Sequence, residues 1–172
     1  MIFKDYPDFT PNLTPTQIFK RGAFGGTYWR PIYSSITKKH YKNVHKRKAL
    51  HKLFNGISEE YLSSTVCNKQ LNKYNVNAST SLRYWEKKKW IKVQDPYGWI
   101  QWYCMFYQGR RTSDDERQID RWKRLAGPNG RFRKRLVNMI KKKKTSYNDY
   151  SISPKIRQTL LHWAYELKNS DL

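Results

Sequence analysis

The sequence predicts a mainly α-helical fold: a compact bundle of about six helices, with an irregular N-terminal segment in which short strands are allowed. Apolar side chains recur at helical spacing in the second half of the chain, and helix-start and helix-stop residues bracket them. Aromatic residues make up 16% of the 172 residues, which supplies a core and argues against a disordered basic tail. We expect a single basic domain over residues 1–172, with an N-terminal arm and short helix at 1–23, a core at 24–144, and a C-terminal linker and helix at 145–172.

The first helix is predicted to follow Thr14. This residue is placed to cap the helix, Pro15 would occupy its first position, and Gln17 would close a capping box. The helix should stop at Gly22, because glycine commonly follows the last helical residue.

Between residues 25 and 79 the helix signals are weaker. Glycines and a proline make the beginning irregular, with one short extended piece expected at 32–33. A helix is expected over 45–54, because its leucines and Phe54 can face inward. Ser58 and the two acids after it indicate another helix start. The Asn- and Lys-rich stretch at 67–79 indicates a loop.

Five helices with clearer boundaries follow, and they are expected over 82–89, 95–109, 113–126, 130–144 and 154–167. Thr80 or Ser81 should cap the first, and Asp95 followed by Pro96 should open the second. The second contains aromatic side chains at i, i+3, i+4 and i+7, which should form the central stripe of the core. These residues are Trp99, Trp102, Tyr103, Phe106 and Tyr107.

Positive charge dominates the chain. Lys and Arg number 35 against 13 Asp and Glu, so the formal net charge is +22. Residues 9–58 contain ten basic residues and no acid, and residues 109–144 contain 14 basic residues against 4 acids. A folded domain with this imbalance repels itself unless a polyanion lies against it. We therefore expect DNA or RNA as the partner. An anionic membrane surface is the weaker alternative, because the basic residues form no single amphipathic stripe.

Other classes of protein are disfavoured. No run of 18 apolar residues is present to cross a membrane, and the first residues lack the apolar stretch of a secretory signal. Cys67 and Cys104 could form one bridge, but we expect two reduced thiols of a cytosolic or nuclear protein. His40, His45 and His51 are irregularly spaced and lack paired cysteines, so no metal site is predicted. No cofactor is indicated.

A long and distinctive motif runs through the middle of the chain. It consists of DPYGWIQWYC at 95–104, QGRR at 108–111, DDERQI at 114–119 and RW at 121–122, with GGTYWRPI upstream at 25–32. Over roughly residues 24–140 the chain resembles an uncharacterised protein family of large DNA viruses, algae and fungi. The resemblance implies a viral or nuclear-type protein. Its expected location is the host nucleus or cytoplasm, with the virion as the alternative. It implies no particular activity.

The leading candidate for nucleic-acid contact is the predicted helix at 130–144. Phe132, Leu136 and Ile140 define its inward face, so its basic residues spread over the outer and flanking faces, where they can follow a phosphate backbone. The candidate contacts are Arg131, Arg133, Lys134, Arg135, Lys141 and Lys142. A solvated helix face is the alternative, although no acid interrupts residues 123–144.

Arg110 and Arg111 are a second candidate. They follow Gly109 and precede the predicted helix at 113–126, so they could clamp a phosphate. Alternatively they form ion pairs with the acids at 114–116. Those acids are typical of a helix N-terminus.

Exposed aromatic side chains could stack on unpaired bases. Tyr28, Trp29 and Tyr33 are the best candidates, because they lie in an irregular segment beside Arg30 and the basic stretch after it. Arg30 is itself a candidate phosphate contact. The alternative is that these rings pack against the aromatic helix at 95–109.

The sequence thus predicts a nucleic-acid-binding protein that contacts phosphates through basic helices. One alternative is an enzyme of the nuclease or modification type, using residues 25–30 and the acids Asp95, Asp114 and Asp115. Its catalytic residues cannot be assigned from the sequence. The other alternative is a virion or assembly protein whose charge neutralises a packaged genome or an acidic partner.

Overall fold

The chain folds mainly into α-helices, which confirms the predicted fold class. The computed structural model describes residues 1–78 and 80–172. Its helices are α1 (Pro15–Lys20), α2 (His51–Phe54), α3 (Leu82–Lys87), α4 (Trp99–Tyr107), α5 (Asp115–Ala126), α6 (Arg131–Lys143) and α7 (Pro154–His162). Strands β1 (Ile32–Ser34) and β2 (Lys39–Tyr41) form a short antiparallel hairpin. Single 3₁₀ turns lie at Val44–Lys46, Glu59–Tyr61, Lys69–Leu71 and Asn169–Asp171.

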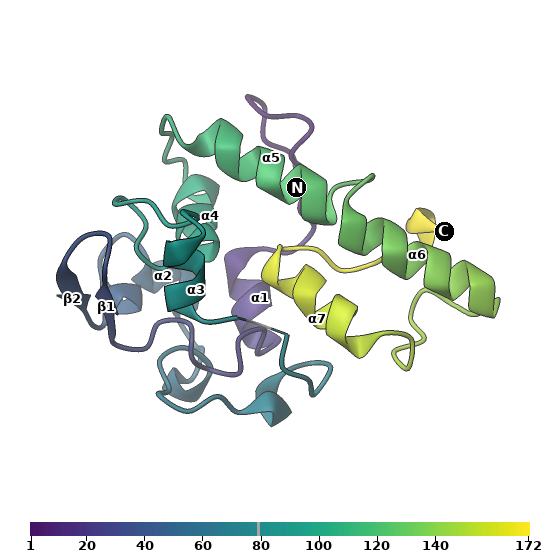
Figure 1. Cartoon of the computed structure of the whole chain (residues 1–172), viewed down its shortest axis with the longest axis horizontal. Helices are drawn as coiled ribbons and strands as arrows, with labels where there is room; N and C mark the ends of the chain where they lie inside the picture. The colour runs from purple at the N-terminus through teal and green to yellow at the C-terminus, as the bar shows by residue number, and fades with distance from the viewer. Residues whose placement is uncertain (79) are drawn as a thin grey trace.

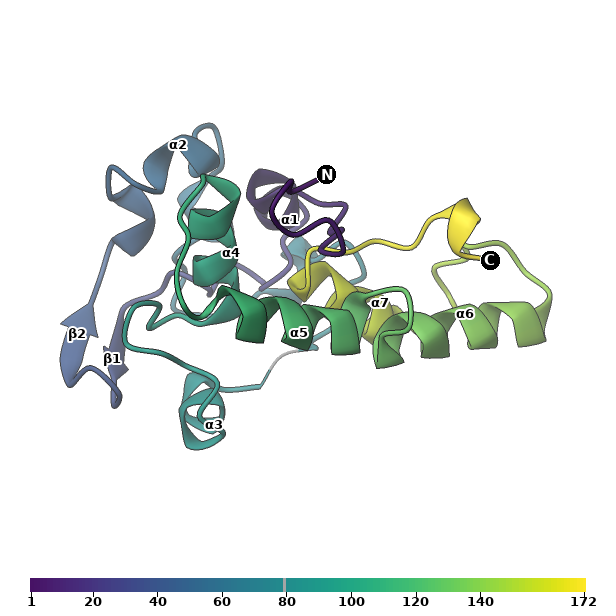
Figure 2. The same ribbon diagram turned by 90° about the horizontal axis from the view of Figure 1, so that it is seen from above.

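The arrangement of the helices leaves α3 apart from the rest. Helices α5 and α6 follow one another along one side of the molecule, and α7 packs beside α6 (Figure 1). Helix α4 packs against α1, and the hairpin lies at the opposite end from α6 (Figure 2). Helix α3 is tied to the hairpin by Glu86, whose carboxylate accepts hydrogen bonds from the hydroxyls of Ser34 and Ser35 at 3.2 and 2.7 Å.

The core is built around α4, whose aromatic stripe is buried as predicted. The buried rings are Trp99, Trp102, Tyr103 and Phe106, and Tyr107 is partly buried. Phe9 from the N-terminal arm packs edge-on against Tyr103 and Trp122, at ring-centroid distances of 6.0 and 5.1 Å. Such pairs contribute about 0.5–1.5 kcal/mol each beyond the burial of their area. The N-terminal arm is therefore held against both α4 and α5.

Helix α4 begins later than predicted. It starts at Trp99, and Asp95 and Pro96 lie before it in a turn closed by the Gly98 N–H, which donates to the Asp95 carbonyl at 2.8 Å. The N-cap residue is Gly98, whose φ of +86° only glycine adopts readily. The prediction that Asp95 caps this helix is therefore wrong, and its carboxylate is free to pair elsewhere.

The beginning of the fold follows the sequence closely. Helix α1 has the predicted capping box: Gln17 N–H donates to the Thr14 hydroxyl, and Thr14 N–H donates to the Gln17 side chain. Strand β1 covers the predicted extended piece at 32–33. Its partner β2 was not expected, because Lys39, His40 and Tyr41 are too few to show apolar alternation and lie in a basic stretch.

The helix expected over 45–54 is interrupted. A 3₁₀ turn ends at Lys46, Arg47 is extended with ψ of 148°, and α2 begins only at His51. The turn is held by His45, which is buried and whose Nε2 lies 3.1 Å from the Glu59 carboxylate. Ser58 likewise begins only a 3₁₀ turn. Side-chain contacts between these two turns take the place of a continuous helix.

Helices α3, α5, α6 and α7 lie within their predicted ranges, and only the C-terminal end of α7 differs clearly from expectation. Helices α5 and α6 begin and end within two residues of expectation. Helix α3 is capped by Ser81, whose hydroxyl accepts from Tyr84 N–H at 3.2 Å. Helix α7 ends at His162, earlier than predicted, because Ala164 has a left-handed φ of +55°. Residue 79, the last of the predicted loop at 67–79, lies outside the described residues.

Candidate nucleic-acid interface

A surface groove with a volume of about 790 Å³ lies between α3, α5, the start of α6 and the end of α7. Arginines and aromatic rings dominate its walls. We call it the arginine groove, and its defining residues are Arg117, Arg121, Arg124, Arg131, Tyr84, Trp85, Trp90, Trp99, Phe132 and Trp163. No aspartate or glutamate is among the described residues that line it. The groove is therefore suited to an anionic ligand with flat, apolar parts.

Helix α5 supplies three of these arginines because of their spacing. Arg117, Arg121 and Arg124 stand at i, i+4 and i+7, which places them on one face of a helix. The other face buries Ile119 and Trp122 in the core. Packing of the apolar face therefore directs all three guanidinium groups towards the groove. This spacing is visible in the sequence, but a search for continuous basic runs does not reveal it.

Arg121 occupies the centre of the arginine groove. Its guanidinium carbon lies 5.1 Å from the centroid of the Trp90 ring and 5.4 Å from that of Trp163. Burial is the main cause, and Arg117 a further one, of a pKa lowered to about 10. The group remains charged at neutral pH. It donates to the side-chain oxygen of Gln118 at 3.0 Å but forms no ion pair among the described residues.

The other three arginines differ in how far their charge is neutralised. Arg117 forms a bidentate pair with Asp114 at 2.5 and 2.7 Å. Arg124 is exposed. Arg131 is exposed and lies over the Phe132 ring at 4.6 Å. Neither Arg124 nor Arg131 has a carboxylate partner within the part of the chain that the structure describes. Three uncompensated cations thus converge on one hollow.

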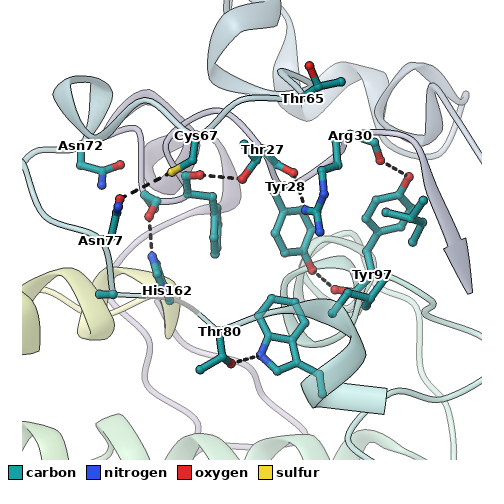
Figure 3. Close-up of a pocket in the computed structure, with 16 residues that line it drawn as sticks. Thr27, Tyr28, Arg30, Thr65, Cys67, Asn72, Asn77, Thr80, Tyr97 and His162 are labelled. Carbon is teal, nitrogen blue, oxygen red and sulfur yellow. Dashed lines mark hydrogen bonds between the residues drawn. The ribbon is translucent and has the colours of Figure 1, made fainter. Parts of the chain in front are cut away.

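A second cavity of about 390 Å³ adjoins the arginine groove. We call it the polar pocket, and its own lining residues include Thr27, Arg30, Thr65, Cys67, Asn72 and Asn77 (Figure 3). The two cavities share the residues Phe24, Tyr28, Ala78, Thr80, Trp85, Tyr97 and His162. They therefore form one continuous hollow, with the arginines of α5 at one end and Arg30 at the other.

The shape of the polar pocket depends on Asn72. Its side-chain oxygen accepts from Gly25 N–H at 2.9 Å, and its side-chain nitrogen donates to the Val76 carbonyl at 2.7 Å. Gly26 packs so closely that an added Cβ would lie 2.0 Å from the Glu60 carbonyl oxygen. The Gly25–Gly26 pair therefore joins two loops. The Gly25 N–H is thereby engaged within the fold.

Most of the basic residues predicted on α6 are exposed. Lys134, Arg135, Lys141 and Lys142 lie on its outer surface, and Arg131 also lines the arginine groove. Arg133 is different: it pairs with Asp171 at 2.5 Å and lies over the Tyr165 ring at 4.4 Å. Arg133 stands three and seven residues before the buried Leu136 and Ile140, so it lies on the inward side of α6. Its role as a phosphate contact stays a prediction.

Arg110 and Arg111 form ion pairs, but not with the acids at 114–116. Arg110 donates to both oxygens of the buried Asp95, at 2.9 and 2.6 Å. Burial raises the pKa of the Asp95 carboxyl, and Arg110 opposes that rise. Arg110 is therefore engaged in an ion pair with Asp95, and its role as a phosphate clamp stays a prediction. Arg111 pairs with the half-exposed Asp5 at 2.5 Å and lies 3.8 Å from the Phe106 ring centroid.

Two of the three predicted stacking residues are in the core. Tyr28 and Trp29 are 5% and 0% exposed, which corrects their assignment as base-stacking side chains. The Tyr28 hydroxyl donates to the Tyr97 carbonyl at 2.6 Å and accepts from Gln101 N–H at 3.0 Å. These rings fasten the irregular segment to α4. Tyr33 is 50% exposed and remains available.

The acids that the enzyme alternative invokes are occupied by structural contacts. Asp115 is buried and accepts from the Trp102 indole N–H and from the Thr112 N–H and hydroxyl. Asp114 holds Arg117, and Asp95 holds Arg110. Arg30, Arg110, Arg111 and Asp95 do not converge in one pocket.

Two further properties concern the described residues as a whole. No three of their His, Cys, Asp or Glu side chains are grouped so as to hold a metal ion. None of their helices combines the length and apolar character needed to cross a membrane. Cys67 and Cys104 are free thiols, as expected.

No family model, curated protein or solved structure matches the chain. The resemblance based on the DPYGW motif therefore stays a prediction.

Proposed function

We propose that the protein binds nucleic acid, with the phosphates of a single-stranded segment lying along the arginine groove. The observation that supports this proposal most directly is the set of arginines at 121, 124 and 131, which have no carboxylate partner and line a groove without any carboxylate among the described lining residues. Arginine presents a planar array of donors that matches phosphate oxygens, and it is weakly hydrated compared with lysine. A phosphodiester chain is the common biological polyanion with this geometry.

The electrostatic state of Arg121 favours an anionic ligand. Its charge is partly buried and lies near the charges of Arg117 and Arg124, which together lower its pKa. An anion in the groove would offset both the burial and the repulsion. The net charge of +22 adds a long-range attraction for polyanions.

The aromatic walls favour unpaired over paired nucleotides. Trp90 and Tyr84 are 36% and 42% exposed, and their rings contact at a centroid distance of 5.7 Å. Bases in a duplex are stacked on each other and offer no free face, whereas unpaired bases stack on aromatic side chains at about 1–3 kcal/mol per base. The exposed basic side chains of α6 would extend the phosphate path beyond the groove.

The test is titration of fluorescently labelled single-stranded and duplex oligonucleotides at several salt concentrations, followed by anisotropy. For a single strand the log–log slope of affinity against salt should be about −0.7 per phosphate contacted. The double variant Arg121→Gln/Arg124→Gln should bind more weakly. Its slope should be shallower by about 0.7 or more, which corresponds to the loss of at least one phosphate contact. The single strand should bind more tightly than the duplex.

A matched control is the double variant Lys39→Gln/Lys42→Gln, which removes the same charge from exposed residues of the hairpin and its edge. It should retain the slope of the parent protein. Equal losses in both double variants would mean that only net charge matters. Absence of binding at low salt would end the proposal.

A further inference from the structure

We infer that the polar pocket takes one unpaired nucleobase, whose adjoining phosphate lies on the arginine groove. The inference rests on the proposed function and specifies it further. It starts from the continuity of the two cavities, which share walls made of Phe24, Tyr28, Trp85, Tyr97 and His162. A nucleotide is a ligand with one flat, neutral part and one anionic part. The hollow has one aromatic part, in which Arg30 is the single charged side chain among the described lining residues, and one part that several arginines line.

The walls of the polar pocket suit a flat ring. Phe24 and His162 are stacked, with a centroid distance of 4.5 Å and an interplanar angle of 20°. Burial lowers the pKa of His162 to about 4, so this wall is neutral at physiological pH. Trp85 also lines the pocket, and its indole N–H donates to the Thr80 hydroxyl at 2.6 Å. The volume of about 390 Å³ is at the lower end of small-molecule sites, which suits one base.

Two polar side chains in the pocket have donors to spare. Arg30 reaches in beside Tyr28 and uses one nitrogen to donate to the Thr27 carbonyl at 2.9 Å (Figure 3). Its other guanidinium N–H groups bond to nothing in the described part of the chain. The side-chain oxygen of Asn77 accepts from the Cys67 thiol at 3.6 Å, which leaves its NH₂ group free of partners among the described residues.

The surplus of donors indicates which bases fit. Guanine offers O6 and N7 as a pair of acceptors for arginine, and uracil or thymine offers carbonyl oxygens. Adenine presents an amino donor next to N7, which would face the donors of Arg30 and Asn77. We therefore expect the pocket to prefer keto-bearing bases over adenine.

The experiment uses pentanucleotides that are abasic except for one central base, which prevents binding in shifted registers. Affinity is measured by anisotropy and compared with that of the fully abasic strand. A central guanine or thymine should increase affinity about 5- to 100-fold, and adenine should increase it less. Trp85→Ala and Arg30→Gln should remove most of this gain, whereas the hairpin control Lys39→Gln should keep it.

Free guanosine and thymidine monophosphates form a second arm, monitored by the Trp85 indole N–H resonance in the full chain. If a free nucleotide shifts that resonance at concentrations similar to those at which the strand binds, the base pocket is supported. Its ligand is then a free nucleotide. If the abasic strand binds with a steep salt dependence but a central base adds nothing, the base pocket is refuted and the proposed function stands. If neither strands nor monophosphates bind or move Trp85, both proposals fail.

Discussion

At the residue scale, the scarce acids decide which arginines are available. Asp95 holds Arg110, Asp171 holds Arg133, and Asp5 holds Arg111. In each pair the carboxylate compensates the charge of one guanidinium group. Arg30 and Arg121 have no such partner among the described residues, and both face the continuous hollow. A count of arginines along the sequence cannot separate these two groups, because the separation depends on which acid folds against which cation.

A prediction at this scale concerns His162. Its pKa is about 4 in the folded protein against an ordinary value of 6.5, because burial disfavours the imidazolium. The unfolded chain therefore binds the proton first, so the stability contributed by the neutral ring is complete above pH 6.5 and is lost as pH falls towards 4. Because the His162 ring is partly exposed, the expected loss of unfolding free energy is about 2 kcal/mol. Urea unfolding between pH 7 and 4.5 should show this loss.

The substitution His162→Phe should flatten that part of the pH profile. The Ala23 carbonyl, to which His162 donates, also accepts from the Gln158 side chain at 2.6 Å, so it keeps a partner. His40→Gln, at an exposed histidine, is the control and should leave the slope intact. An unchanged slope in His162→Phe would show that other groups are responsible.

At the scale of elements, α5 joins the core to the arginine groove. One face packs Trp122 and Ile119 inward, and the other presents three arginines. Helix α4 is positioned by the turn before it, which depends on Gly98. An alanine there would keep φ of +86°, and its Cβ would lie 2.8 Å from Cδ1 of Ile91, which also lines the groove. The start of α4 and one wall of the groove thus share a single constrained residue.

Gly98→Ala is therefore expected to destabilise the protein by about 2–3 kcal/mol, from backbone strain and the contact with Ile91. Gly56→Ala is the comparison, because Gly56 also has a positive φ, of +73°, but an added Cβ meets nothing within 4 Å. It should cost only about 1 kcal/mol. Thermal or urea unfolding of both variants measures the difference, and equal effects would contradict the role assigned to the Ile91 contact.

At the scale of the whole molecule, a net charge of +22 acts against folding and in favour of polyanion binding. Both effects weaken as salt screens the charges, because the Debye length falls to about 10 Å at 0.1 M. Stability and affinity should therefore change in opposite directions over the same range of salt.

We expect the melting temperature of the free protein to rise by several degrees between 20 and 300 mM NaCl, while the affinity for single-stranded nucleic acid falls. For a chain of this length, 1 kcal/mol corresponds to about 2–4 °C. Differential scanning calorimetry measures the first change and anisotropy the second. A melting temperature that is flat or falls with salt would show that the cations are already compensated within the fold.

The sequence by itself determined the helical class, the capping box of α1, the aromatic stripe of α4 and the boundaries of α5 and α6. These features depend on local periodicity and on capping groups within a few residues, so they can be read along the chain. It also determined that the protein is strongly cationic. The interruption of the helix expected at 45–54 was out of reach, because the contact between His45 and Glu59 joins residues that no local pattern connects.

Only the tertiary structure decided which side chains form the site. The hollow combines Arg30 from an irregular segment with Trp85 of α3, Arg121 of α5, Arg131 of α6 and His162 of α7. The tertiary structure also placed Tyr28 and Trp29 in the core, and it paired Arg110, Arg111 and Arg133 with carboxylates. Periodicity shows which face of a helix is apolar, but not which other segment lies opposite its polar face. That juxtaposition is a property of the packing of distant elements, and it gathers part of the general excess of charge in one hollow.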